Sequence, residues 1–268
     1  MNETLYNLTI LLTTHCTLKC KLCATYASTH PHPSHFSSTK MLQAADRFFA
    51  CMGSHESVNL LTLSGGEPLL HPQLLEILKG LTKHLPQVQK FEIITNGTIV
   101  PQDAILQQLS HMDKVDVMID HYGDILSPKV HALAAAFDRY GIAYRIRDYH
   151  SENPHLGGWL DISDFTDKHR TPEENAALFQ KCQYSTTFSH HFFIIDGLAF
   201  MCYVNHKLLP QLQENDNEHV DMLDESLSQE ALRAQLLELR NKQYQTLCAR
   251  CNGFCVDGPR YAPAEQLP

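Results

Sequence analysis

The chain has 268 residues, with 21 Lys and Arg against 30 Asp and Glu, a formal net charge of −9, and 43% hydrophobic content. No cluster of basic residues occurs, which excludes the electrostatic footprint of a nucleic-acid-binding protein. No run approaches the roughly 20 apolar residues of a membrane helix, and the first residues lack the basic leader of a signal peptide. We therefore expect a cytoplasmic protein with no nucleic-acid or membrane partner.

Strand-like and helix-like runs alternate along the first 149 residues. The expected strands are residues 5–13, 58–64, 90–95, 114–120 and 143–149, and the expected helices are residues 41–52, 71–85, 104–112 and 128–140. Strands separated by helices predict a parallel sheet with right-handed crossovers. We interpret residues 1–150 as an α/β domain, a partial (β/α) barrel related to the TIM barrel.

The pattern changes after residue 150. Residues 151–180 indicate a linker, followed by a helix with Thr171 as N-cap and Pro172 at its first position. Residues 192–203 predict a hairpin that turns at Asp196 and Gly197, and residues 226–244 predict an amphipathic helix. We assign residues 181–268 to a second, smaller domain.

The cysteines fall into two groups and one isolated residue. The first group follows the first predicted strand with Cys-x3-Cys-x2-Cys spacing. The isolated residue is Cys51, which lies in a predicted helix, and we expect it to pack in the core. The first group is Cys16, Cys20 and Cys23, and the second is Cys182, Cys202, Cys248, Cys251 and Cys255. Patterned cysteines in a reducing cytosol predict metal ligands. Three thiolates can hold an iron–sulfur cube with one open iron, and a zinc site completed by a distant ligand is the alternative.

Two further motifs end predicted strands. Gly65, Gly66 and Glu67 lie in the sequence LSGGEPLL after the second strand, and Asn96 follows the third. Two glycines let a ligand approach the backbone, and the glutamate offers a carboxylate to a cationic amine. In a barrel, reactive groups gather where the strands end.

The cysteine loop followed by GGEP resembles the radical S-adenosylmethionine (SAM) superfamily, over residues 5 to about 150. The resemblance implies that Cys16, Cys20 and Cys23 hold a [4Fe–4S] cluster whose open iron binds SAM. An electron donor such as flavodoxin or ferredoxin would reduce the cluster. The enzyme would then cleave SAM to a 5′-deoxyadenosyl radical that abstracts hydrogen from a small-molecule substrate.

The same resemblance assigns cofactor contacts. It implies that Gly65, Gly66 and Glu67 contact the methionine amino group of SAM and that Asn96 lines the SAM pocket. Leu22 stands where the family often has an aromatic residue near the adenine, and it can supply apolar contact there.

The second cysteine group resembles the SPASM or twitch extension of radical SAM enzymes. The resemblance implies one auxiliary [4Fe–4S] cluster, ligated by Cys182, Cys202, Cys248 and Cys251, with Cys255 spare or replacing one of them. A zinc knuckle is the alternative. The compact chain is similar to aminocyclitol dehydrogenases, which implies oxidation of a sugar- or cyclitol-like alcohol with the auxiliary cluster as electron acceptor. A ribosomal-peptide maturase and a zinc-stabilised, non-catalytic binding protein are the alternatives.

Two arginines share one face of the fifth predicted strand. Arg145 and Arg147 could hold the SAM carboxylate or a substrate anion, and one of them could take the proton of an alcohol. The alternative is surface pairing with Asp148 or Glu152. Trp159, in a Gly-rich loop, is expected to pack in the core, with a cover for the pocket as the alternative.

Overall fold

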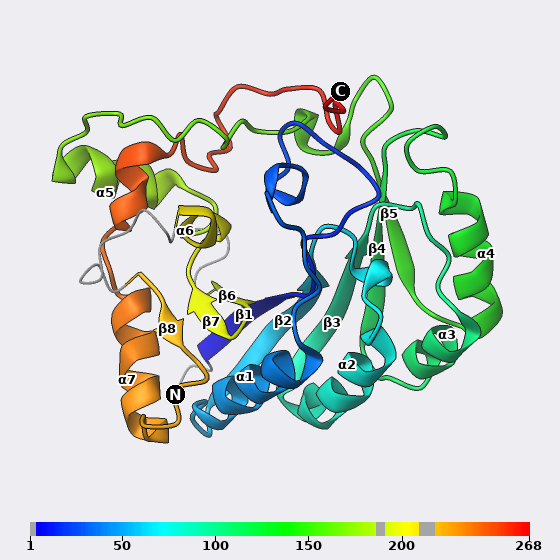
Figure 1. The fold of residues 1–268 in the computed structure, drawn as a ribbon, viewed down its shortest axis with the longest axis horizontal. Helices are drawn as coiled ribbons and strands as arrows, with labels where there is room; N and C mark the ends of the chain where they lie inside the picture. The colour runs from blue at the N-terminus through cyan, green and yellow to red at the C-terminus, as the bar shows by residue number, and fades with distance from the viewer. Residues whose placement is uncertain (1–3, 186–190, 209–217) are drawn as a thin grey trace.

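The computed structural model describes residues 4–185, 191–208 and 218–268. Within these residues the strands form one sheet in the order β5-β4-β3-β2-β1-β6-β7-β8 (Figure 1). The strands are β1 (Thr4–Leu11), β2 (Glu56–Ser64), β3 (Val88–Thr95), β4 (Val115–His121), β5 (Tyr144–Asp148), β6 (His191–Ile195), β7 (Leu198–Phe200) and β8 (Val220–Asp221). The first six run parallel, whereas β7 pairs antiparallel with β6 and β8 pairs antiparallel with β7.

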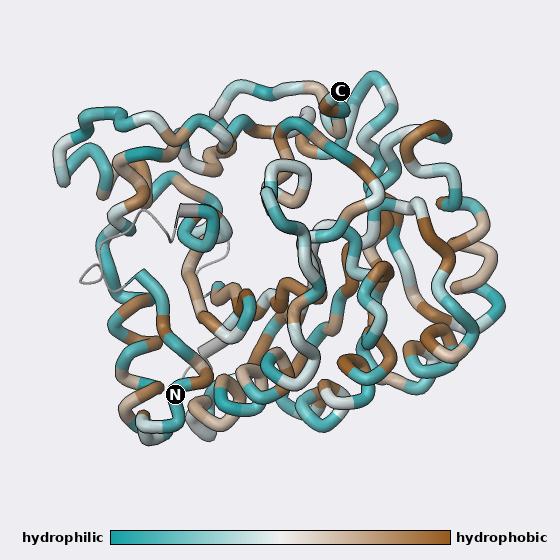
Figure 2. Tube along the Cα trace, viewed as in Figure 1, coloured by the Kyte–Doolittle hydropathy of each residue, from teal (hydrophilic) through white to brown (hydrophobic). Residues whose placement is uncertain are grey.

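The helices that connect the parallel strands cover one face of this sheet. They are α1 (Ser38–Ala50), α2 (Leu74–Leu81), α3 (Asp103–Ser110) and α4 (Val130–Tyr140). Figure 1 shows them side by side along the outer side of the strands, and Figure 2 shows hydrophobic and hydrophilic residues alternating along their coils, as amphipathic helices require. The expected α/β fold, a partial TIM-like barrel, is confirmed, and a small antiparallel region follows it.

The remaining helices belong to the second half of the chain. They are α5 (Pro172–Lys181), α6 (Tyr203–Leu208) and α7 (Gln229–Arg240). As expected, Thr171 caps α5, and it forms a capping box in which its side chain accepts the Glu174 backbone N–H. The β6–β7 turn at Asp196 and Gly197 is also confirmed, since both residues have positive φ, 47° and 87°.

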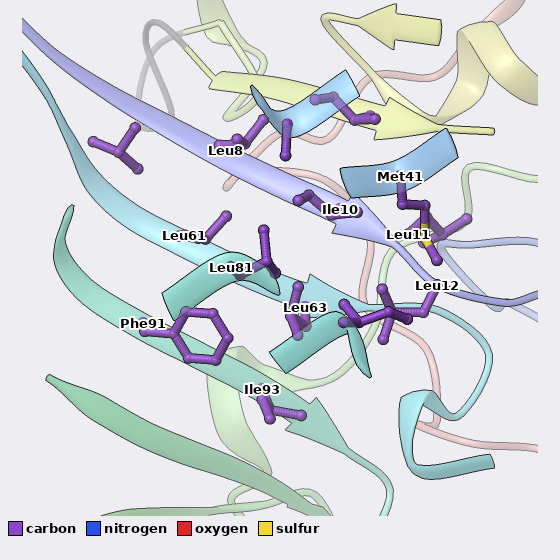
Figure 3. Packing of buried hydrophobic residues seen from close by; sticks show 14 of the residues in the cluster. Leu8, Ile10, Leu11, Leu12, Met41, Leu61, Leu63, Leu81, Phe91 and Ile93 are labelled. Atoms are coloured by element: carbon purple, nitrogen blue, oxygen red, sulfur yellow. The ribbon is translucent and has the colours of Figure 1, made fainter. Parts of the chain in front are cut away.

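The core lies between the sheet and the helices. Leu8 pairs in register with Leu61, and Leu61 pairs with Phe91, so three apolar side chains form a row across β1, β2 and β3 (Figure 3). The row repeats two residues further on at Ile10, Leu63 and Ile93. Each of these side chains is at most 1% exposed, and burial of one such side chain stabilises the fold by roughly 1.5–3 kcal/mol. This alternation fixes which face of each strand meets the helices.

Two expected elements differ from the structure. The helix expected at 71–85 is α2 at Leu74–Leu81 followed by a 3₁₀ turn at Thr82–Gln87, which contains Pro86, a residue that cannot donate a helical hydrogen bond. The strand expected to reach residue 203 ends at Phe200, and α6 begins at Tyr203 instead. The described part of the chain contains no helix long and apolar enough to cross a membrane.

Candidate active site

A cavity of about 360 Å³ lies where the parallel strands end, on the face of the sheet opposite the helices. Its volume is in the range of small-molecule sites. Thr9 pairs in register with Thr62, and Thr62 with Glu92, and all three line the cavity. Along each strand these residues alternate with those of the apolar core row. Because successive side chains of a strand point to opposite faces, one face of the sheet is apolar and the other carries polar groups.

The loop between β1 and α1 brings Cys16, Cys20 and Cys23 to the wall of this cavity. Its path is fixed by one hydrogen bond within the loop and one to a distant segment. Ser28 Oγ donates to the Cys20 carbonyl over 2.5 Å, and the buried Tyr26 hydroxyl donates to the Ile162 carbonyl over 2.9 Å. The three predicted ligands therefore border one space, in a loop that is anchored internally and to Ile162.

The surroundings of the thiols fit a set of metal-bound sulfurs. The Leu18 N–H lies 3.4 Å from Cys16 Sγ, and the Gln266 amide lies 3.3 Å from Cys20 Sγ, so N–H donors already point at sulfur. Burial raises the pKa of Cys16 to about 12 and that of Cys20 to about 11; metal binding must therefore release their protons. No three His, Cys, Asp or Glu side chains among the described residues converge on a single metal ion, and ligands of a cube need no such convergence because they bind different iron atoms.

Gly65 and Gly66 lie against the start of the cysteine loop. The Gly66 N–H donates to the Thr13 carbonyl over 2.8 Å. A Cβ on Gly66 would lie 2.2 Å from the His15 carbonyl oxygen, and one on Gly65 would lie 2.7 Å from that of Thr13. Side chains are thus excluded at both positions, and the bare backbone lines the cavity as expected for close approach by a ligand.

Glu67 is held by hydrogen-bond donors of the protein. Its side chain is fully buried and is absent from the cavity wall. The carboxylate accepts hydrogen bonds from the Thr95 hydroxyl at 2.9 Å, the Asn96 N–H at 2.8 Å and the Leu69 N–H at 3.0 Å. In this structure the carboxylate joins the segment after β2 to the end of β3, and contact between Glu67 and the SAM amine stays a prediction. Burial raises the pKa of Glu67 to about 7, against the lowering effect of these bonds.

Asn96 and Leu22 both line the cavity, where the sequence places a SAM pocket. Asn96 Nδ2 donates to Thr17 Oγ1 over 3.0 Å and lies 3.5 Å from Cys16 Sγ. Its Oδ1 accepts the Thr98 hydroxyl over 2.6 Å. Asn96 therefore connects the cysteine loop to the end of β3, and its contact with Cys16 is one that the motif alone does not reveal.

The two arginines of β5 occupy different environments. Arg147 lines the cavity and makes two hydrogen bonds to Asp120, of 2.6 and 2.8 Å. Arg145 does not line it; its side chain is 51% exposed and pairs with Glu92 and Asp116. The arginines share a face as expected, but their partners are carboxylates of β3 and β4 rather than Asp148 or Glu152. Trp159 lines the cavity.

Sequence reasoning missed several cavity residues. His191 of β6 and Tyr203 of α6 reach the cavity because β6 pairs with β1. No local pattern reveals this contact, in which Thr9 and His191 are 182 residues apart in the chain. His191 Nε2 lies 2.8 Å from Thr9 Oγ1, and burial lowers the pKa of the imidazole to about 3. Glu92 could have been noticed as a charged residue between the apolar Phe91 and Ile93 of a predicted strand.

The second cysteine group surrounds a separate, mainly apolar cavity. The lining cysteines are Cys182, Cys202, Cys248 and Cys251. Cys255 is absent from this lining, although its backbone forms a β-bridge with Cys182. Arg170 Nη1 donates to the carbonyls of Cys248 and Cys251, each over 2.8 Å, which fixes the Cys-x2-Cys turn.

Three side chains separate the two cavities. Ile162, Tyr184 and Phe254 line both of them. Tyr184 stacks on Phe254, with ring centroids 5.2 Å apart. The space bordered by the first cysteine group and that bordered by the second are therefore divided by a wall of one layer of side chains.

Comparisons with known proteins identify the family and the fold. A family model described as the radical SAM superfamily matches residues 10–151. A "Probable GTP 3',8-cyclase" from Methanocella arvoryzae is 31% identical over 114 residues, which are 42% of this chain and 34% of that protein. The chain thus matches about a third of the length of this curated relative.

Two solved structures share the fold over nearly the whole chain. BtrN in complex with AdoMet and 2-DOIA matches with a TM-score of 0.51 at 14% identity, covering 97% of this chain and 99% of that one. Native anSMEcpe with bound AdoMet matches with a TM-score of 0.51 at 13% identity, covering 94% and 89%. At these identities the likeness concerns the fold alone.

Proposed function

The chain belongs to the radical SAM superfamily, and we propose that it oxidises a small sugar- or cyclitol-like alcohol. The observation that carries the proposal is the convergence of Cys16, Cys20 and Cys23 with the Gly-Gly turn and Asn96 on one cavity. When bound there, a reduced [4Fe–4S] cluster and SAM supply a 5′-deoxyadenosyl radical that removes a hydrogen atom from the substrate.

The chain's own residues would bind and orient these groups. The cysteine loop supplies three thiolates, and the bare backbone of Gly65 and Gly66 leaves room for the amino-acid end of SAM. Asn96 holds the loop against β3, and Leu22 offers an apolar surface. Trp159 lies edge-on to Tyr122, with ring centroids 5.6 Å apart, and together they shield the cavity from water.

The polar strand face supports a hydroxylated substrate. Thr9, Thr62 and Glu92 form a row of hydrogen-bonding groups along it. Oxidation of an alcohol removes one hydrogen atom, one proton and one electron. Glu92 is a candidate to receive the hydroxyl proton, because burial raises its pKa against the opposing effect of Arg147. Arg147, held by Asp120, would orient the substrate rather than act as a base.

The electron needs an acceptor close to the cavity. We propose an auxiliary cluster on Cys182, Cys202, Cys248 and Cys251, which border the second cavity together. The shared wall of Ile162, Tyr184 and Phe254 supports a short transfer path. On this proposal residues 1–150 are the radical SAM core, 151–180 a linker and 181–268 the auxiliary cluster domain, although β6 joins the sheet of the core.

The fold of BtrN, which was solved with AdoMet and 2-DOIA, spans nearly this whole chain, and this supports a small-molecule substrate. Modification of a ribosomal peptide is the second candidate, because the spacing of the second cysteine group also resembles the SPASM extension. A zinc-stabilised, non-catalytic protein is the third. Measuring the metal content separates the zinc-stabilised protein from the two enzymes. Assaying activity on a panel of cyclitols and peptides separates the alcohol-oxidising enzyme from the peptide-modifying enzyme.

The test uses the double variant Cys248→Ala/Cys251→Ala with Cys255→Ala as the matched control. Iron, 5′-deoxyadenosine and oxidised product are measured on the same anaerobic samples. We expect the double variant to lose about half of its iron, on a count of two clusters, and to cleave SAM slowly without making product. Cys255→Ala should retain iron and product. Full product formation by the double variant contradicts the auxiliary role, and severe iron loss in Cys255→Ala contradicts the choice of ligands.

A further inference from the structure

Residues 260–267 form a strap that borders the cavity and then crosses the cysteine loop. Arg260 lines the cavity, and Tyr261 forms a two-way backbone pair with Trp159, with N···O distances of 2.8 and 2.9 Å. Figure 1 shows this segment, in red, beside the blue loop that follows β1. The strap therefore contacts both the cover of the cavity and the loop that holds the first cysteine group.

Backbone pairing joins the strap to the loop around Cys20. The Lys21 N–H donates to the Glu265 carbonyl over 2.7 Å, and the Leu267 N–H donates to the Lys19 carbonyl over 2.8 Å. Ala264, 1% exposed, packs with Leu18 and Cys20 in a small apolar cluster. These contacts make a short antiparallel bridge between segments more than 240 residues apart.

One side chain of the strap reaches the sulfur of Cys20. Gln266 Nε2 lies 3.3 Å from Cys20 Sγ and also donates to the Ala264 carbonyl over 2.7 Å. Its Oε1 accepts the Lys19 N–H over 2.8 Å. A flipped amide would face the Lys19 N–H with a donor and the Ala264 carbonyl with an acceptor. The neighbours therefore fix the orientation in which Gln266 donates to the sulfur.

We propose that Gln266 is a positioning residue that raises the reduction potential of the cluster held by Cys16, Cys20 and Cys23. This inference rests on the proposed function only in that Cys20 is a cluster ligand. Electron density on the ligand sulfurs increases when a cluster is reduced, so a donated N–H stabilises the reduced form more than the oxidised form. The fixed amide of Gln266 thus favours the electron transfer that precedes SAM cleavage.

The test is an EPR-monitored redox titration of the iron-loaded protein, in which the signal altered by added SAM identifies this cluster. Gln266→Leu removes the donor and should shift the midpoint potential to a more negative value. Gln266→Glu keeps the size of the side chain but brings a carboxylate oxygen to the sulfur, and it should shift the potential further in the same direction. Gln107→Leu, the same substitution on the exposed face of α3, should leave the potential unchanged.

A second measurement on iron-free protein keeps the inference testable should a variant lose iron. Hydrogen exchange should show protection at the Lys21 and Leu267 amides, because both are donors in the bridge. Free exchange at both amides would overturn the inference, as would equal midpoint potentials in wild type, Gln266→Leu and Gln266→Glu. A wild-type protein that binds no iron would instead contradict the proposed function.

Discussion

The carboxylate of Glu67 gives a stability prediction that does not depend on any cofactor. The side chain is fully buried and receives three hydrogen bonds, one from Leu69 in the turn that follows it and two from Thr95 and Asn96 at the end of β3. Burial raises its pKa from 4.5 to about 7. A folded-state pKa above the unfolded value contributes stability that is complete below the unfolded pKa and is lost as pH rises through the folded pKa. The contribution of Glu67 to the free energy of unfolding therefore decreases as pH rises from about 4.5 to 7.

The substitution Glu67→Gln removes this titration while it conserves the volume of the side chain. With pKa values of about 7 folded and 4.5 unfolded, the wild type should lose about 2.5 kcal/mol relative to the variant between pH 5 and pH 8. The amide of the variant cannot accept all three hydrogen bonds, and this lowers its free energy of unfolding. The reduction is the same at both pH values, so it cancels when the two pH values are compared.

The assay is urea unfolding of the iron-free, reduced protein at pH 5 and pH 8. Glu238→Gln, which removes a carboxylate from an exposed position of α7, serves as the matched control. The free energy of unfolding of Glu67→Gln should approach or exceed that of the wild type at pH 8 and lie below it at pH 5. A difference between the two proteins that stays within about 0.5 kcal/mol across this range would refute the buried, ionisable role of Glu67.

Two further predictions concern the cavity wall. Gly66→Ala should destabilise the iron-free chain by about 1–3 kcal/mol because its Cβ would lie 2.2 Å from a backbone oxygen. Gly53→Ala, whose nearest neighbour would be 3.4 Å away, should change stability by less than about 1 kcal/mol, and equal urea midpoints for the two variants contradict the contact. Arg147→Ala should cost roughly 3 kcal/mol because it leaves the buried Asp120 unpaired, whereas Arg145→Ala, at a half-exposed site, should cost about 1 kcal/mol. If unfolding and SAM binding respond equally to both arginine changes, the two environments do not differ as described.

Short-range signals accounted for much of the fold. The alternation that buries Leu8 and Leu61 on one face is visible in the sequence, as is the turn at Asp196 and Gly197, because both depend on neighbouring residues. The cysteine loop and the Gly-Gly turn could be predicted as strand-end features because parallel strands end at one edge of a sheet. The structure shows that they border one cavity.

Features that depend on pairing between distant segments could not be predicted. His191 enters the cavity only because β6 lies beside β1, and Gln266 reaches Cys20 through a bridge with no sequence motif. The direction of the Glu67 side chain is a third example. The motif shows where the residue lies along the chain, whereas the donors on β3 determine what its carboxylate binds.

We propose that the first cysteine group forms a cluster site that cleaves SAM. The direct measurement is 5′-deoxyadenosine produced from SAM and reductant by anaerobically purified protein, together with its iron and zinc content. We expect about two [4Fe–4S] clusters per chain in the wild type. Replacing Cys16, Cys20 and Cys23 with Ala should abolish 5′-deoxyadenosine formation. Stoichiometric zinc without iron in the wild type, or SAM cleavage by the triple variant, would contradict the claim.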